Sequence, residues 1–146
     1  MGRLEELKKK KHELNEESIR INNEIYLLER ENEELLQEKL KVLVGRAFKT
    51  TSGNVYYVYT VPPREVDVMG HSRFNPYQIP VLSVSMEKDY DTHIKYPEIS
   101  TETLYSRCCD ADDPLEAFRE EYMEIDIYDF IDEARTAIIN FIDEHH

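Results

Sequence analysis

The chain has 146 residues, and its formal net charge is −13 with 34% charged side chains. It contains no apolar run near the roughly 20 residues that a membrane-spanning helix needs. Residues 1–45 carry a net charge of −2, residues 46–109 a net charge of 0 and residues 110–146 a net charge of −11. Such an acidic segment repels the nucleic-acid backbone and attracts a basic protein surface. We therefore expect no membrane segment, no direct nucleic-acid binding, and a basic protein as partner.

The first 44 residues, the arm, repeat an apolar side chain at every seventh position, which is the d position of a heptad. A sustained heptad repeat predicts a coiled coil, although the other seam position, a, is polar in four of its six occurrences. A helix with such a stripe needs a partner, and we expect self-association, most simply as a dimer. The predicted oligomerisation residues are Leu7, Leu14, Ile21, Ile25, Leu28, Asn32, Leu35 and Val42.

The sequence does not decide whether the two helices of this coiled coil are parallel or antiparallel. A parallel dimer would pair Asn32 with its copy, an arrangement that sets register. An antiparallel dimer, which we favour slightly, would bring the basic run 8–11 near the acidic run 29–38. The helix could instead fold onto its own domain. Apolar residues cover most of the circumference over 35–44, which predicts that this end is wedged into the body before Gly45 stops the helix.

The remaining residues predict a small α+β domain, so that the domains are a coiled-coil oligomerisation helix at 1–45 and a body at 46–146. We expect a long N-terminal helix, a small antiparallel sheet or partial barrel, and a C-terminal amphipathic helix. Alternating and β-branched patterns predict strands at 46–49, 55–61, 65–69, 81–86 and 102–108. The polar segment 87–101 is expected to be a long connection.

Two helices are expected in the acidic C-terminal part. A short helical piece should run from Pro114 to Tyr122, and Asp126 should cap a longer helix over 127–144. The buried stripe expected on the longer helix is Ile127, Phe130, Ile131, Ala134, Ile138 and Ile142.

Motifs that carry catalysis or cofactor binding are missing from the sequence. It has no glycine-rich phosphate loop, no G-x-S-x-G, no H-E-x-x-H and no paired C-x-x-C. An EF-hand loop starting at Asp110 would need glycine at its sixth position, where this chain has Leu115. The adjacent Cys108 and Cys109 suggest reduced, structural thiols. We expect no catalytic residue, no metal, no cofactor, and a cytoplasmic location in a bacterial or virus-infected cell.

Two sets of residues are candidates for recognition. Acids in the C-terminal part could engage a basic partner, although solubility alone is the simpler explanation of such a surface. These acids are Asp110, Asp112, Asp113, Glu116, Glu120, Glu121, Asp129, Asp132 and Glu133. The loop 70–78 gathers basic, amide and aromatic side chains between strands, a composition typical of recognition loops. These are His71, Arg73, Phe74, Asn75 and Tyr77.

A leucine-rich arm, a compact β-rich body and an acidic helical tail resemble the layout of small accessory proteins of bacteriophages and mobile elements. The resemblance implies a non-enzymatic inhibitor that blocks a host nuclease or defence protein with its acidic surface, as some anti-CRISPR proteins do. Two other functions remain open. The chain could bind a small molecule between subunits near the loop 70–78, or it could be a structural or regulatory subunit whose arm pairs with a different protein.

Overall fold

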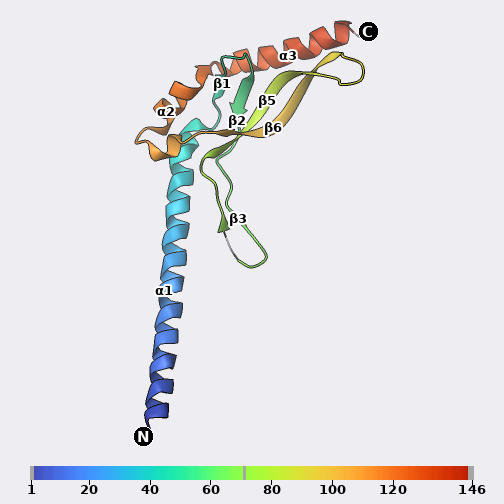
Figure 1. Ribbon diagram of the computed structural model, residues 1–146. Coiled ribbons are helices and arrows are strands. Elements are labelled where there is room, and N and C mark those ends of the chain that lie inside the picture. The colour runs from blue at the N-terminus through green and yellow to red at the C-terminus, as the bar shows by residue number, and fades with distance from the viewer. Residues whose placement is uncertain (1, 71, 145–146) are drawn as a thin grey trace. The chain divides into compact units, whose positions relative to one another are not determined.

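A computed structural model describes residues 2–70 and 72–144, and the chain divides into two compact units, Met1–Leu35 and Leu36–His146. The first unit consists of most of helix α1 (Arg3–Leu40) (Figure 1). Its helical interior lacks proline and glycine, and Glu5 and Glu6 in the first turn interact favourably with the helix dipole. Surface pairs one turn apart, such as Arg30 with Glu34 at 3.2 Å, add only a few tenths of a kcal/mol. The covering of its apolar stripe therefore matters for the stability of this helix.

The last turns of α1 belong to the second unit. Leu40 and Leu43 are buried in its core, and Leu43 lies in the short 3-10 helix η1 (Lys41–Leu43). Gly45 follows with a φ of 85°, and its N–H donates to the carbonyl of Val58 at 2.8 Å. The predicted wedge is therefore present. The compact units divide after residue 35, ten residues before the expected boundary, because this wedge packs with the body.

Val42 is the last residue of the predicted oligomerisation stripe. It lies in η1, after the α-helix has ended at Leu40, and it is 39% exposed. The tighter 3-10 turn breaks the 3.5-residue spacing on which a heptad depends. Val42 consequently no longer continues the line of the preceding d positions.

The body is built on an open five-stranded antiparallel sheet with the strand order β6-β5-β2-β1-β7. A second sheet pairs β3 with β4 in two strands, and the α+β prediction is confirmed, as an open sheet and not a closed barrel. The bounds are β1 (Ala47–Lys49), β2 (Val55–Val58), β3 (Glu65–Val66), β4 (Ser72–Arg73), β5 (Gln78–Lys88), β6 (Lys95–Tyr105) and β7 (Met123–Ile125).

The expected long connection at 87–101 is wrong. Strands β5 and β6 are eleven residues each, and they pair in one register from Gln78 opposite Tyr105 to Lys88 opposite Lys95. The side chain of Asp89 organises the turn by accepting the backbone N–H groups of Asp91 and Thr92. His93 occupies the left-handed position, with a φ of 59°. The turn was missed because this position usually holds glycine or asparagine.

The two faces of the sheet carry separate clusters. On one face Phe48, Val58 and Val81 pack with Leu43 and with Phe118 of α2 (Pro114–Glu121). On the other face Ala47, Val55 and Val84 pack with Phe130 of α3 (Ile127–Glu144). Alternation along the strands explains this division, since successive side chains point to opposite faces.

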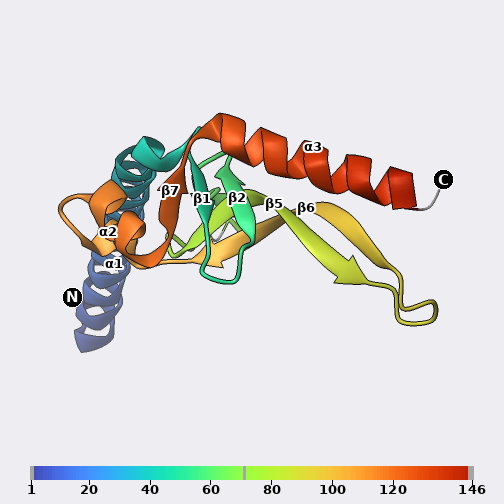
Figure 2. The same cartoon turned by 90° about the horizontal axis from the view of Figure 1, so that it is seen from above.

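Helix α3 buries less of its apolar surface than its pattern predicts. Phe130 is buried and Ala134 packs against the sheet, but Ile131, Ile138 and Ile142 are 39–53% exposed. Eighteen residues make a helix of about 27 Å at 1.5 Å per residue. Figure 2 shows α3 extending past the short strands β1 and β2 toward the end of the β5–β6 hairpin. Only two strands continue that far, so the second half of the helix lacks a full sheet beneath it.

Edge strand β7 is tied to the body by Glu124. One of its carboxylate oxygens accepts a hydrogen bond from Arg46 at 3.0 Å, and the other accepts one from Arg119 at 2.7 Å. Partial burial raises the pKa of Glu124, but the hydrogen bonds from Arg119 and Arg46 outweigh this effect and hold that pKa below its ordinary value of 4.5. The carboxylate form is therefore favoured in the folded chain.

We expect Glu124→Gln to lower the free energy of unfolding by about 1 kcal/mol at neutral pH. A depressed pKa stabilises the fold above about pH 4.5, and the contribution is lost as the pH falls through the pKa of the folded state. Urea unfolding of both proteins across this range should show the difference shrinking in acid. A difference that stays constant with pH would contradict the role of the charge.

Candidate protein-binding surfaces

The heptad stripe of the first unit is exposed to water. Every described residue from 2 to 32 is exposed. Off the stripe, Ile19, Tyr26 and Leu27 are also exposed, which widens the apolar surface around the middle of the arm. Exposed apolar side chains in such number make this helix a candidate interaction surface. The stripe side chains with exposed fractions of 47–68% are Leu7, Leu14, Ile21, Ile25, Leu28 and Leu35.

The last two polar a positions of the heptad, Asn32 and Lys39, lie in different environments. Asn32 is exposed, as a register-setting residue of a coiled coil has to be before assembly. The Nζ of Lys39, which occupies the next a position, donates to the carbonyl oxygen of Cys109 at 2.9 Å. Lys39 is therefore engaged within the body, and we place the end of the seam at Leu35.

The predicted acids of the C-terminal part fall into two groups, one around α2 (110–121) and one on α3 (129–133). Three members of the first group have structural roles. Asp110 accepts a hydrogen bond from the hydroxyl of Tyr77 at 3.3 Å. Asp113 caps α2 by accepting the backbone N–H of Glu116. Glu121 accepts the hydroxyl of buried Ser106 at 2.8 Å. Replacing these acids would disturb the fold together with any binding.

The rest of the first group is exposed on or beside α2. Glu116 lies 3.6 Å from Arg119 in a surface ion pair. Asp112 and Glu120 are exposed, and neither side chain has a hydrogen bond or ion pair among residues 2–70 and 72–144. The sequence alone did not separate these acids from those that hold the fold, because all of them are carboxylates in one run.

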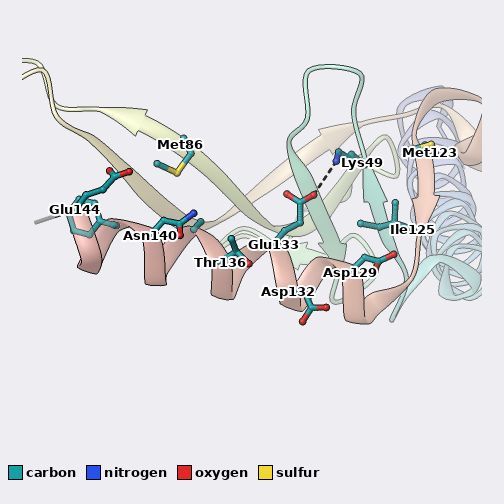
Figure 3. A pocket seen from close by; sticks show the side chains of 12 residues that line it. Lys49, Met86, Met123, Ile125, Asp129, Asp132, Glu133, Thr136, Asn140 and Glu144 are labelled. Atoms are coloured by element: carbon teal, nitrogen blue, oxygen red, sulfur yellow. Dashed lines mark hydrogen bonds and ion pairs between the residues drawn. The ribbon is translucent and has the colours of Figure 1, made fainter.

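The second group of acids lines a groove along α3, with a volume of about 740 Å³ (Figure 3). Helix α3 forms one wall over four turns, and the other wall comes from β1, β5 and β7. Glu133 meets the Nζ of Lys49 across the groove at 3.1 Å. The lining residues are Lys49, Met86, Met123, Ile125, Asp129, Asp132, Glu133, Thr136, Ala137, Asn140, Phe141 and Glu144.

The groove brings Asp129, Asp132 and Glu133 together with apolar residues that sequence reasoning missed. Met123 and Ile125 come from β7, and their alternation around Glu124 was the available signal for this strand. Three residues are too few for that signal to stand out from an adjoining helix. The groove could not be anticipated without both β7 and the extended β5–β6 hairpin.

The loop 70–78 is divided between two places. Arg73, Phe74 and Asn75 line a second hollow of about 540 Å³, beside Pro80 of β5. Tyr77 instead lies under the guanidinium of Arg107, whose central carbon is 5.3 Å from the ring centroid. His71 lies outside the described residues. The loop therefore supplies three of its five candidate residues to one hollow.

The two cysteines are buried free thiols, as expected from their sequence context. Burial and the neighbouring Asp110 raise the pKa of Cys109 to about 11, so its thiol is protonated at neutral pH. A thiolate is the form that attacks electrophiles or binds metals. No group of three or more His, Cys, Asp or Glu able to hold a metal is found in the described part of the chain.

Comparison with known proteins gives no relative. No family model, curated protein or solved structure matches the chain. Among the described residues, no helix is both long and apolar enough to cross a membrane.

Proposed function

We propose that the chain is a non-enzymatic, self-associating binding protein. Its arm joins copies of the chain, and the acidic surface of its body engages a basic protein surface. In the setting that the layout suggests, the partner is a nuclease or defence protein of a host cell, and the chain is its phage-encoded inhibitor.

The exposed stripe on α1 is the observation that carries the proposal. Each leucine or isoleucine side chain that becomes fully buried contributes roughly 1.5–3 kcal/mol. Six such side chains between Leu7 and Leu35 are about half exposed in the single chain. Covering them offsets the loss of translational and rotational freedom on association, which costs at least several kcal/mol.

The charge of the body supports the second half of the proposal. Thirteen acids and only two bases lie between residues 110 and 146. The bases, Arg119 and Arg135, both lie within 4 Å of a neighbouring carboxylate. Their charge is partly compensated locally, so the net field around α2 and α3 is negative and favours a cationic partner.

Light scattering on the full chain tests self-association. We expect a molar mass of at least twice the 17.4 kDa of one chain at micromolar concentration, with dissociation on dilution. A particle of 17.4 kDa at every concentration would refute self-association. In that case, pairing of the arm with a different protein becomes the better explanation of the stripe.

The hollow beside the loop 70–78 favours a second candidate function, the binding of a small molecule. Its volume is within the range of ligand pockets. It ranks below the first because Tyr77 is engaged elsewhere, and because exposed Arg73 and Asn75 line the hollow with little enclosure. Its postulated place between subunits also presupposes the self-association proposed here.

A further inference from the structure

The groove along α3 is long enough to accompany a helix over about four turns. Its lining residues on α3 recur at intervals of three and four from Asp129 to Glu144, which places them on one face. The sixteen residues 129–144 span about 22 Å, or roughly four helical turns. Thr136 and Ala137 keep the middle of this wall low, so that a second helix can approach closely.

The opposite wall offers apolar side chains that the fold leaves uncovered. Met86 is 53% exposed and Met123 is 61% exposed, and both line the groove together with Ile125, as labelled in Figure 3. Methionine side chains are flexible and polarizable, and they adapt to partners of different shape. An apolar stripe on an incoming helix would therefore find contacts on this wall.

The charge around the groove selects the occupant. Among the described lining residues, Asp129, Asp132, Glu133 and Glu144 are acids, and the one base, Lys49, is paired with Glu133. A second copy of α3 carries five acids and one arginine, so two such helices would repel each other. A helix with lysine or arginine beside an apolar stripe complements both the acids and the methionines.

We propose that this groove binds an amphipathic basic helix supplied by another protein. The proposal rests on the function proposed above and gives its acidic surface a location and a partner class. It assigns the contact to the acids on α3 and not to those around α2. Apolar anchors of the partner pack on Met86 and Met123, and its basic residues reach the acids at the groove rim.

Fluorescence anisotropy with a labelled 15-residue amphipathic peptide of leucine and lysine tests the proposal on the full chain. We expect this peptide to bind at least about tenfold more tightly than a scrambled peptide of the same composition that forms no apolar face. Added salt should weaken the binding. Equal affinity for both peptides would contradict the assignment of the groove as a helix-binding site, and would indicate binding to a diffuse acidic surface.

Two adjacent residues provide a matched pair of variants. Asn140 is exposed and lines the groove, whereas Ile139 is exposed and does not line it. Asn140→Arg should weaken peptide binding at least about tenfold, and Ile139→Arg, which makes the same change in charge, should weaken it less than about twofold. Met86→Arg on the opposite wall should act like Asn140→Arg. Equal losses for Ile139→Arg and Asn140→Arg would overturn the assignment.

A second probe distinguishes a partner from a copy of this chain. The basic start of the arm, residues 2–16, contains Leu4, Leu7 and the lysines at 8–11. We expect a peptide of this sequence to bind more weakly than the leucine–lysine probe, because its interleaved glutamates face the groove acids. Tighter binding of the arm peptide would contradict the proposal, because it would make a second copy of this chain the better occupant of the groove. Light scattering reports self-association separately, so failure of the groove and failure of the proposed function are distinguishable.

Discussion

Substitution of Phe118 by alanine is expected to lower the free energy of unfolding of the body by about 3–5 kcal/mol. The side chain is fully buried, and its ring centroid lies 4.6 Å from that of Phe48 in an edge-on arrangement. It also contacts Tyr122, at a centroid distance of 4.8 Å. Removing it opens a cavity between α2, the sheet and the wedge formed by Leu40 and Leu43.

Tyrosine fluorescence during urea unfolding measures this effect, because nine of the ten tyrosines lie in the second unit and the chain lacks tryptophan. The control is Tyr128→Ala, at a residue that is 71% exposed on α3. This variant should change stability by less than about 0.5 kcal/mol. Similar losses for Tyr128→Ala and Phe118→Ala would contradict the central position of Phe118 in the core.

Much of this core could be predicted from sequence, because it depends on local patterns. The alternation of Val55 to Val58 placed successive side chains on opposite faces of the sheet, and both faces are indeed covered. The cap by Asp126 was also correct, since its carboxylate accepts the backbone N–H of Tyr128 at 2.8 Å. Such features are decided within a few residues, and the neighbouring chain segments reinforce them.

Features that depend on distant segments were missed. The strand β6 pattern alternates apolar and polar residues only weakly, because half of this edge strand faces water on both sides. The exposure of Ile138 and Ile142 on α3 could not be foreseen, because it depends on how far the sheet extends beneath the helix. The candidate groove depends on strand β6 and on the exposed second half of α3, so sequence periodicity could not predict its walls. Three of its acids were nevertheless predicted as partner-binding residues.

On the arm, the sequence pattern predicts contacts that a single chain cannot make, namely contacts with a second copy. We expect Ile21→Glu to raise the dissociation constant of self-association at least about 100-fold. Ile21 is a central d residue that is 48% exposed in the single chain. Each copy loses an apolar contact of roughly 1.5–3 kcal/mol, and a dimer loses it twice. The introduced carboxylates would also face an apolar seam, which adds a desolvation cost.

Asn23→Glu is the matched control, since it adds the same charge two residues further along the helix. Asn23 occupies the f position, which faces away from a heptad seam. Sedimentation velocity over a dilution series should show Ile21→Glu as a 17.4 kDa particle at concentrations where Asn23→Glu remains associated. Circular dichroism should show that the isolated Ile21→Glu chain loses part of its helix, since a lone arm depends on a partner to cover its apolar face. If both variants associate equally, the surface that joins the copies does not include the d stripe.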